Sequence, residues 1–207
     1  MADDPPLEPL QPESPDPPTS PDEPAQPWTV LRSELVYTTP WLALRQDQLR
    51  THTGAAITYT YLTVRDAVFV VPLTAAGEIV LLRQYRHPVR AWCWEVPAGA
   101  LAAGEDAPTA AARELREEVG GVCRELRPLG TFYASNGVSD ERFHLFLALG
   151  VVLGANAPEQ SELLRVAPLP AARALALARA GAITDGPSAL ALLLAAPALT
   201  APHADDW

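Results

Sequence analysis

The chain has 207 residues and a formal net charge of −10 at pH 7, which allows one sizeable domain, or one domain with a small appendage. Residues 1–27 carry seven of the acidic side chains and no basic one, so residues 28–207 have a net charge of only −3, which argues against a nucleic-acid polymer as the main partner. No stretch is long and apolar enough to cross a membrane, and the first residues lack the basic and apolar segments of a secretion signal, so we expect a cytoplasmic protein.

The two ends of the chain differ from the middle. Residues 1–27 contain ten of the 22 prolines and very few large apolar side chains, so they bury too little surface to offset the entropy lost on ordering. We expect this acidic, proline-rich segment to be disordered and residues 199–207 to form a flexible C-terminus.

Five β-strands are predicted before the middle of the chain. The first three are rich in β-branched and aromatic residues and lie at residues 29–37, 41–49 and 57–64. We expect residues 28–64 to form an N-terminal antiparallel β segment. Residues 67–73 are almost continuously apolar, which is typical of a strand covered on both faces, and a turn leads from them to a strand at 78–85.

A glutamate-rich helix follows, and then the remaining elements. Strands are predicted at residues 122–133, 142–151 and 163–166, and helices at residues 170–180 and from Asp185 or Ser188 to 196. Strands on both sides of one helix, with two helices at the end, indicate a layered α/β domain. We place its bounds at residues 65–198.

Three carboxylates of the glutamate-rich helix share one face. Glu114, Glu117 and Glu118 are spaced i, i+3, i+4, so at 3.6 residues per turn they point the same way. Like charges at this spacing repel, and a divalent cation would compensate them; hard oxygen ligands suit Mg²⁺ or Mn²⁺. The alternative is a solvated acidic face of a surface helix.

The residues around these glutamates fit a unit that presents a metal ion. Asp106 is a suitable N-cap, and Gly120 suits a left-handed C-cap. Gly99 would let the chain bend sharply and bring backbone carbonyls toward the metal. Arg113 is placed to pair with Glu105 or Glu117 and so to orient the ligands.

The stretch from residue 99 to 121 resembles the signature of the Nudix hydrolases, which cleave nucleoside diphosphates linked to another moiety. All polar positions of that signature are filled, and Gly121 stands where a bulky aliphatic residue is usual. The resemblance implies the Nudix fold, a mixed β-sheet sandwiched between helices, with Mg²⁺ or Mn²⁺ as cofactor. It also implies catalytic parts for Arg113 and Glu117 and metal ligation by Glu114, Glu117 and Glu118.

Other segments narrow the resemblance to the ADP-ribose pyrophosphatase and nucleotide-sugar branch. They are residues 79–88, 94–99 and 137–142, which are similar to segments that recur in that branch. This likeness implies that Arg86 and Glu95 bind substrate, that the carbonyl of Ala98 ligates metal, and that the N-terminal β segment exchanges across a homodimer. Asn136 stands where ADP-ribose hydrolases carry proline, which keeps related nucleotide-sugar and dinucleotide hydrolases open as alternatives.

The remaining site residues are expected from chemistry and from the same resemblance. The paired N–H donors of an arginine guanidinium match the spacing of phosphate oxygens. Arg83 and Arg65 are therefore further candidates, after Arg86, for binding the pyrophosphate. Trp28 is a candidate for stacking on the base, beside other aromatic residues. The resemblance implies a general base on the loop before the last helices, where Glu159 is the first candidate and Glu162 is a further ligand of metal or water; both have a solvated-loop alternative.

Two broader alternatives follow. The chain could be a non-catalytic module that binds a nucleotide sugar, but such modules usually lose signature glutamates, and Glu105, Glu114, Glu117 and Glu118 are all present. Among enzymes, hydrolysis of ADP-ribose to AMP and ribose 5-phosphate is the first expectation, and GDP-mannose, UDP-glucose or a dinucleotide is the second.

Overall fold

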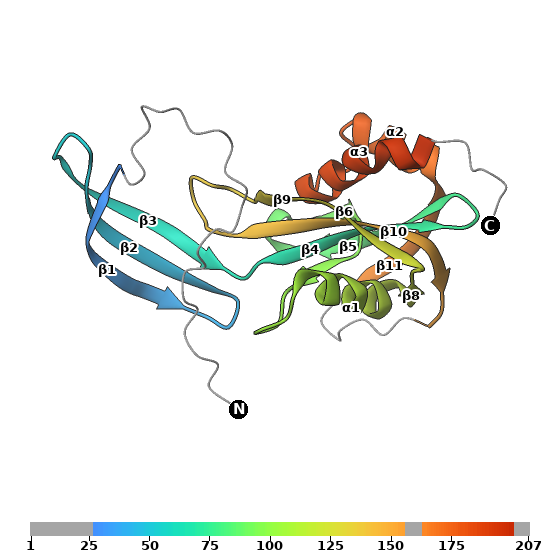
Figure 1. The fold of residues 1–207 in the computed structure, drawn as a ribbon, viewed down its shortest axis with the longest axis horizontal. Helices are drawn as coiled ribbons and strands as arrows, with labels where there is room; N and C mark the ends of the chain where they lie inside the picture. The colour runs from blue at the N-terminus through green and yellow to red at the C-terminus, as the bar shows by residue number, and fades with distance from the viewer. Residues whose placement is uncertain (1–26, 156–162, 201–207) are drawn as a thin grey trace. The chain divides into compact units, whose positions relative to one another are not determined.

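The computed structural model describes residues 27–155 and 163–200, and these form two compact units (Figure 1). Unit 1 comprises residues 27–65 and 133–142, and unit 2 comprises residues 66–132, 143–155 and 163–200. The chain therefore leaves unit 1 after Arg65 and returns to it once, between two strands of unit 2.

Unit 1 is an antiparallel sheet in the order β1-β2-β3 with one loop packed on it. Its strands are β1 (Thr29–Thr38), β2 (Leu42–Arg50) and β3 (Ala56–Val64). The loop is fastened to β3, because the Tyr59 hydroxyl donates to the Gly137 carbonyl at 2.8 Å and the Val64 N–H donates to Asp140 Oδ1 at 2.9 Å. The predicted N-terminal antiparallel segment is thus present.

Unit 2 is built on a mixed sheet with the order β11-β5-β4-β10-β8, in which β6 also pairs with β5, β7 with β4, and β9 with β10. β4 and β10 run parallel, whereas β5 is antiparallel to β4, β6 and β11, β7 is antiparallel to β4, and β8 is antiparallel to β10. The strands are β4 (Ala67–Thr74), β5 (Glu78–Arg86), β6 (Ala91–Glu95), β7 (Ala98–Ala100), β8 (Gly121–Val122), β9 (Glu125–Tyr133), β10 (Arg142–Leu153) and β11 (Leu164–Pro170).

Helices cover both faces of this sheet. α1 (Ala107–Val119) packs on one face, where Leu115 joins Val68 and Val70 of β4 in one core. α2 (Ala171–Arg179) and α3 (Gly186–Thr200) pack on the other face, with Val71 of β4 and Leu145 in a second core. A fully buried aliphatic side chain such as Leu145 contributes about 1.5–3 kcal/mol relative to exposure. The mixed sheet between helices confirms the expected fold class.

The short elements of unit 2 escaped prediction. β6 and β7 are only five and three residues long, and a one-turn helix at His87–Val89 precedes β6. The predicted strand at 122–133 is interrupted, with β8 before the break and β9 after it. Of the helices in the described residues, none has the length and apolarity that crossing a membrane requires.

Candidate functional site

The helix α1 begins and ends at the residues that its capping groups predict. The Thr109 N–H donates to Asp106 Oδ1 at 2.8 Å, and this contact lowers the pKa of Asp106 because it stabilises the ionised form. At the other end Gly120 has a φ of 65°, and its N–H donates to the Arg116 carbonyl. Both caps hold the helix in register with the strand β7 that its glutamates face.

Two of the three predicted metal-ligating glutamates are buried between α1 and β7. Glu118 is 2% exposed and accepts a hydrogen bond from the Ala98 N–H at 2.8 Å. Glu114 is 8% exposed and lies against Gly99, because a Cβ built on Gly99 would come within 2.0 Å of Glu114 Oε1. Glu117 is the most exposed of the three, with its side chain 46% accessible.

Gly99 has a different role from the predicted sharp bend. It lies within β7, paired with Val68, and its φ is not in the left-handed region. The lack of a side chain matters because the backbone approaches the Glu114 carboxylate closely. Gly99 therefore makes room for a carboxylate and does not turn the chain.

Arg113 ties the acidic side chains of this region together. It makes two hydrogen bonds with Glu105, both of 2.9 Å, and its Nη1 donates to Glu114 at 2.6 Å and to Glu117 at 3.1 Å. The same guanidinium donates to the Ala100 carbonyl at 3.0 Å. The hydrogen bonds from Arg113 lower the pKa of Glu105. Both predicted pairings of Arg113 are present, together with a third, to Glu114.

A second ion pair lies at the end of β5. Arg86 Nη2 donates to Glu95 Oε2 at 2.6 Å, and Arg86 Nε contacts both carboxylate oxygens at 3.0 and 3.2 Å. The Glu95 side chain is 3% exposed, whereas that of Arg86 is 44% exposed. The hydrogen bonds to Glu95 raise the pKa of Arg86, and the negative charges of Glu118 and Asp185 raise it further.

Arg83 is not brought to Arg86. The two residues are three apart on β5, so they lie on opposite faces of the strand. The Arg83 guanidinium lies 5.1 Å from the centroid of the Trp94 ring, and Trp94 packs against the core under α2 and α3. The strand alternation was visible in the sequence and argues against grouping these two arginines.

Two further candidates, Arg65 and Trp28, belong to unit 1. Trp28 is 41% exposed, and its ring centroid lies 6.0 Å from that of Tyr59. Trp28 and Tyr59 line a cavity of about 510 Å³ that lies wholly within unit 1, and Arg65 is not among its lining residues. Asn136, at the position where the resemblance expects proline, lines the same cavity.

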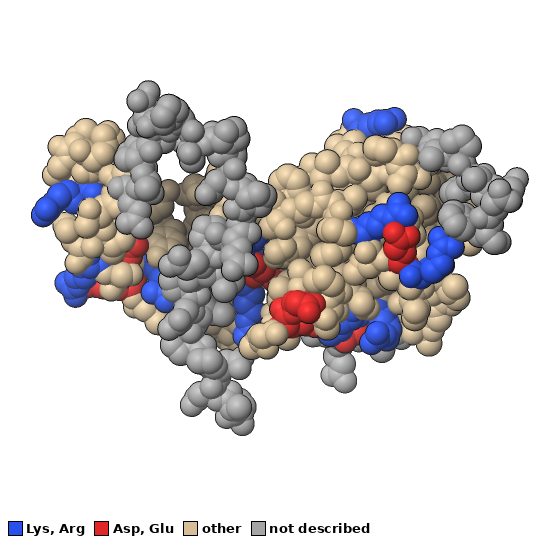
Figure 2. Space-filling view, viewed as in Figure 1, with Lys and Arg blue, Asp and Glu red and all other residues tan. Residues whose placement is uncertain are grey.

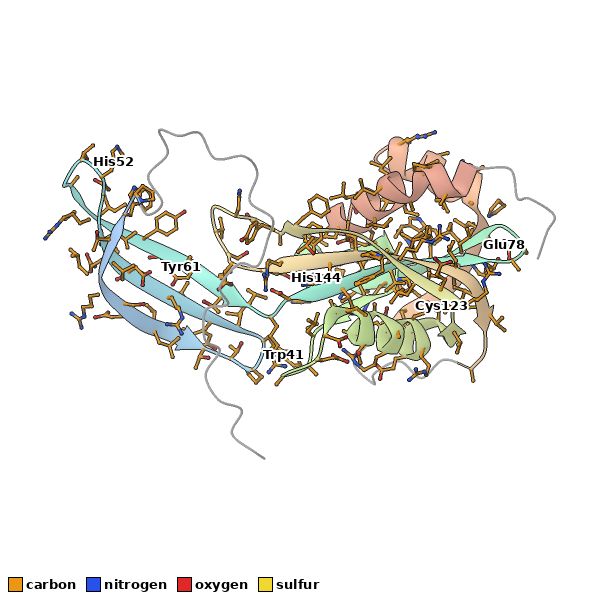
Figure 3. The ribbon with its side chains drawn as sticks, in the orientation of Figure 1. Trp41, His52, Tyr61, Glu78, Cys123 and His144 are labelled. Carbon is orange, nitrogen blue, oxygen red and sulfur yellow. The ribbon has the colours of Figure 1, made fainter. Side chains whose placement is uncertain are left out.

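This cavity contains residues that the sequence did not single out. Asp47 is 8% exposed, and its Oδ1 has no hydrogen-bond partner among the described residues. Burial raises the pKa of Tyr61, on β3 (Figure 3), and the charge of neighbouring Asp47 raises it further. A lone aspartate at an inward position of a predicted strand was the available signal for this site.

His144 lies on β10 (Figure 3). Its Nε2 lies 3.2 Å from Asp66 Oδ2 and its Nδ1 lies 3.0 Å from the Thr131 hydroxyl. Both ring nitrogens therefore have partners inside unit 2.

Glu159 and Glu162, the candidates for base and further ligand, lie outside the described residues. The described ends of their segment are fastened on either side of the site. The Gly154 N–H donates to the Gly120 carbonyl at 2.8 Å, and the Leu163 carbonyl accepts from the Tyr85 N–H at 3.2 Å.

The donor set of α1 suits a hard divalent cation. Three carboxylates project from one helix face, two of them are buried, and the backbone of β7 with its glycine lies against them. Across residues 27–155 and 163–200, no three His, Cys, Asp or Glu side chains already converge as a metal site, and Arg113 engages Glu114 and Glu117. The chemistry of the donors fits, and ligation requires those two carboxylates to turn from Arg113 toward the ion.

Two family descriptions match the chain, one after the other. Residues 28–62 match the nucleoside diphosphate sugar hydrolase N-terminal domain, and residues 63–187 match the NUDIX domain. The second match covers more than half of the chain.

Similar proteins include a methanol dehydrogenase activator of Bacillus methanolicus, 33% identical over 127 residues, which are 61% of this chain and 69% of that protein. An ADP-ribose pyrophosphatase of Mycobacterium tuberculosis is 38% identical over 122 residues, or 58% of this chain and 59% of that protein. A crystal structure of an ADP compounds hydrolase superposes with a TM-score of 0.76 at 23% identity, covering 86% of this chain and 96% of the other, which shows the fold. Together with the acidic face of α1, the match over residues 63–187 shows that this chain belongs to the Nudix family.

Proposed function

We propose that this protein hydrolyses the pyrophosphate bond of a nucleoside diphosphate linked to another moiety, and that its substrate is ADP-ribose, cleaved to AMP and ribose 5-phosphate. The observation that carries the proposal is the row of glutamates on α1, buried against β7 within the Nudix match. The relative named ADP-ribose pyrophosphatase supports the choice of substrate.

In this proposal Glu114, Glu117 and Glu118, with the carbonyl of Ala98, hold Mg²⁺ or Mn²⁺. Such ions neutralise a pyrophosphate, orient it and make water nucleophilic when they are bound. Glu118 is already oriented by the Ala98 N–H, as outer hydrogen bonds orient ligands in other metal sites, whereas Glu114 would turn from Arg113 toward the ion.

Arg86 is the group that binds the phosphates. Its Nε and Nη2 are engaged by Glu95, and its exposed side chain presents the remaining nitrogen, Nη1, to an oxyanion. Arg113 bonds Glu105, Glu114 and Glu117 together and is a positioning residue for them. Glu159, as general base, and Glu162, as a ligand of metal or water, stay proposals from the resemblance.

Taken by itself, the aromatic cavity of unit 1 has groups suited to binding a nucleobase. Trp28 supplies a ring for stacking, and the buried carboxylate of Asp47 supplies an acceptor for an exocyclic amino group. A buried acceptor favours a ligand that donates to it, because leaving it unpaired costs about 1–3 kcal/mol.

A different nucleotide sugar is the second candidate. Asn136 lines the cavity in place of the proline of ADP-ribose hydrolases, and residues 28–62 match an N-terminal domain named for nucleoside diphosphate sugars. The side-chain amide of asparagine offers hydrogen-bond donors and acceptors that proline lacks. If Asn136 contacts the ligand, the preference for sugar or base differs from that of the ADP-ribose hydrolases.

The test is a panel of ADP-ribose, GDP-mannose, UDP-glucose, NADH and ATP, each incubated with the full chain in Mg²⁺ and in EDTA, with products identified by mass spectrometry. We expect AMP and ribose 5-phosphate from ADP-ribose, formed only with the metal. Preference for ATP over every diphosphate-linked compound would contradict the proposal.

Three variants in the same assay test the parts. Glu118→Gln should lower kcat by about 10²-fold or more, since it removes a charge from the metal site. Trp28→Ala should raise KM with little change in kcat, whereas Trp41→Ala, at an exposed tryptophan outside the cavity, should leave both unchanged. If Glu159→Gln and Glu162→Gln both keep the full rate, their segment has no part in the reaction.

A further inference from the structure

We propose that Glu95 is a positioning residue that keeps Arg86 away from the carboxylates of α1. Arg86 then does not compete with the metal ion for those carboxylates, and its guanidinium stays available to the phosphates of the substrate. The inference rests on the proposed function, and it replaces the direct contact with substrate that the resemblance implies for Glu95.

The geometry of the pair leaves the Glu95 carboxylate little access to substrate. Both of its carboxylate oxygens accept hydrogen bonds from Arg86, at 2.6 to 3.2 Å, and the side chain is almost completely buried. A buried anion would also repel a phosphate. Arg86, by contrast, is nearly half exposed and carries the opposite charge.

The pair is formed by a reach along the sheet. Arg86 pairs with Ala91 across the β5–β6 ladder, whereas Glu95 pairs with Leu82, four residues before Arg86, so the two side chains together span this offset on one face of the sheet. Such an extended side chain has a definite direction only while its far end is held. Fork-to-fork pairing with a carboxylate supplies that hold.

A released Arg86 would have other anions close by. Three residues after Glu95, the Ala98 N–H contacts the buried carboxylate of Glu118 at 2.8 Å. The charge of Glu118 already acts on the Arg86 guanidinium and contributes to its raised pKa. Without Glu95, the anions that still attract the Arg86 guanidinium include Glu118, a proposed metal ligand.

The experiment is a double-mutant cycle with Glu95→Gln, Arg86→Ala and the combined variant. Mn²⁺ binding is measured by electron paramagnetic resonance on the full chain without substrate, and KM and kcat are measured separately. Glu95→Gln should weaken Mn²⁺ binding about tenfold, as loss of outer contacts does elsewhere, and should raise KM. In the combined variant, which has no arginine to move, Mn²⁺ affinity should return to within about twofold of the unaltered chain.

A matched control is available at the surface. Glu125 and Arg127 form a pair with contacts of 2.5 and 3.0 Å, but both side chains are about half exposed. Glu125→Gln should leave Mn²⁺ binding and KM unchanged. Thermal unfolding of each variant shows whether it is folded under the conditions of measurement.

Two results would overturn the inference in different ways. If Mn²⁺ binds the unaltered chain and binds Glu95→Gln equally well, or if the combined variant stays as weak as Glu95→Gln, then Glu95 does not act through Arg86. If the unaltered chain binds no Mn²⁺, the metal site of the proposed function fails as well.

Discussion

Gly99 couples the backbone of β7 to a single carboxylate. A Cβ at this position would lie 2.0 Å from Glu114 Oε1, a distance that no pair of unbonded atoms tolerates. The atom that must move is the end of a flexible side chain, not backbone. An added methyl group should therefore displace the carboxylate from its place beside Arg113 while leaving the fold intact.

We predict that Gly99→Ala lowers kcat by about 10²-fold, the cost of misplacing a reacting group by about 1 Å, and shifts the thermal midpoint by only a few degrees. Steady-state kinetics and calorimetry check both parts. Gly186→Ala is the control, because Gly186 has no left-handed φ and nothing lies within 4 Å of its built Cβ. Equal loss of activity in the two variants would count against the close approach at Glu114.

The contacts between residues that could be predicted from the sequence are those set by spacing within one helix or strand. The shared face of Glu114 and Glu118 and the pairing of Arg113 with Glu117 follow from helix geometry, so they were predictable. The pairing of Arg86 with Glu95 depends on which strands become neighbours. Sequence spacing does not contain that information.

The position of the helix α1 is set by its capping residues as well as by the packing of its apolar face. Leu115 and Val119 are buried in the core, but the turn before the helix carries Glu105, and Asp106 fixes where the first turn begins. A helix that started one residue later would rotate its glutamates by about 100° relative to that turn. The cap is therefore linked to the site.

We predict that Asp106→Ala lowers the thermal midpoint at pH 7 and that Asp106→Asn largely preserves it, because asparagine caps as well as aspartate. The folded-state pKa of Asp106 lies below the ordinary value of 3.8. Its ionised form therefore stabilises the fold above about pH 3.8, and this contribution is lost as the pH falls through the lower folded value. Unfolding curves from pH 7 to pH 2.5 should show the gap between the unaltered chain and Asp106→Ala narrowing on acidification. A gap independent of pH would refute a charged cap.

Element prediction succeeded where patterns were long. The strands β1 to β5 and the helix α1 are each eight or more residues long, and each carries an alternating, continuously apolar or helical pattern that the sequence shows. β6 and β7 are too short to show a period, and they form because β5 and β4 offer paired edges. These two strands carry Glu95 and Ala98, so half of the site rests on the elements least visible in the sequence.

At the level of the whole molecule, the sheet between two helical layers was predictable from element order and from the resemblance, whereas the cavity of unit 1 was not. Part of the lining of that cavity comes from residues 133–142, which return to unit 1 and pack on β3. Acidic and basic side chains are interspersed on the face shown in Figure 2. This distribution suits a small charged substrate better than a polymer, which needs a continuous basic stripe.

The strand β1 lies at the edge of its three-stranded sheet, and all ten of its residues are exposed. Several of them are large and apolar, namely Val30, Leu31, Leu35, Val36 and Tyr37. An exposed apolar edge strand is a template for pairing with another chain, and an exposed apolar surface of this kind marks an interaction site. We therefore propose that unit 1 mediates the homodimer that the resemblance implies.

We predict a dimer in size-exclusion chromatography with light scattering at micromolar concentration, and a monomer for the double variant Leu35→Glu, Tyr37→Glu. Charges on this strand cannot be buried between two copies without a large desolvation cost, while their cost in the isolated chain is small because both positions are exposed. Val152→Glu tests a residue of 71% exposure on β10 in unit 2 and should remain dimeric. A double variant that stays dimeric, or a Val152 variant that dissociates equally, would place the interface elsewhere than β1.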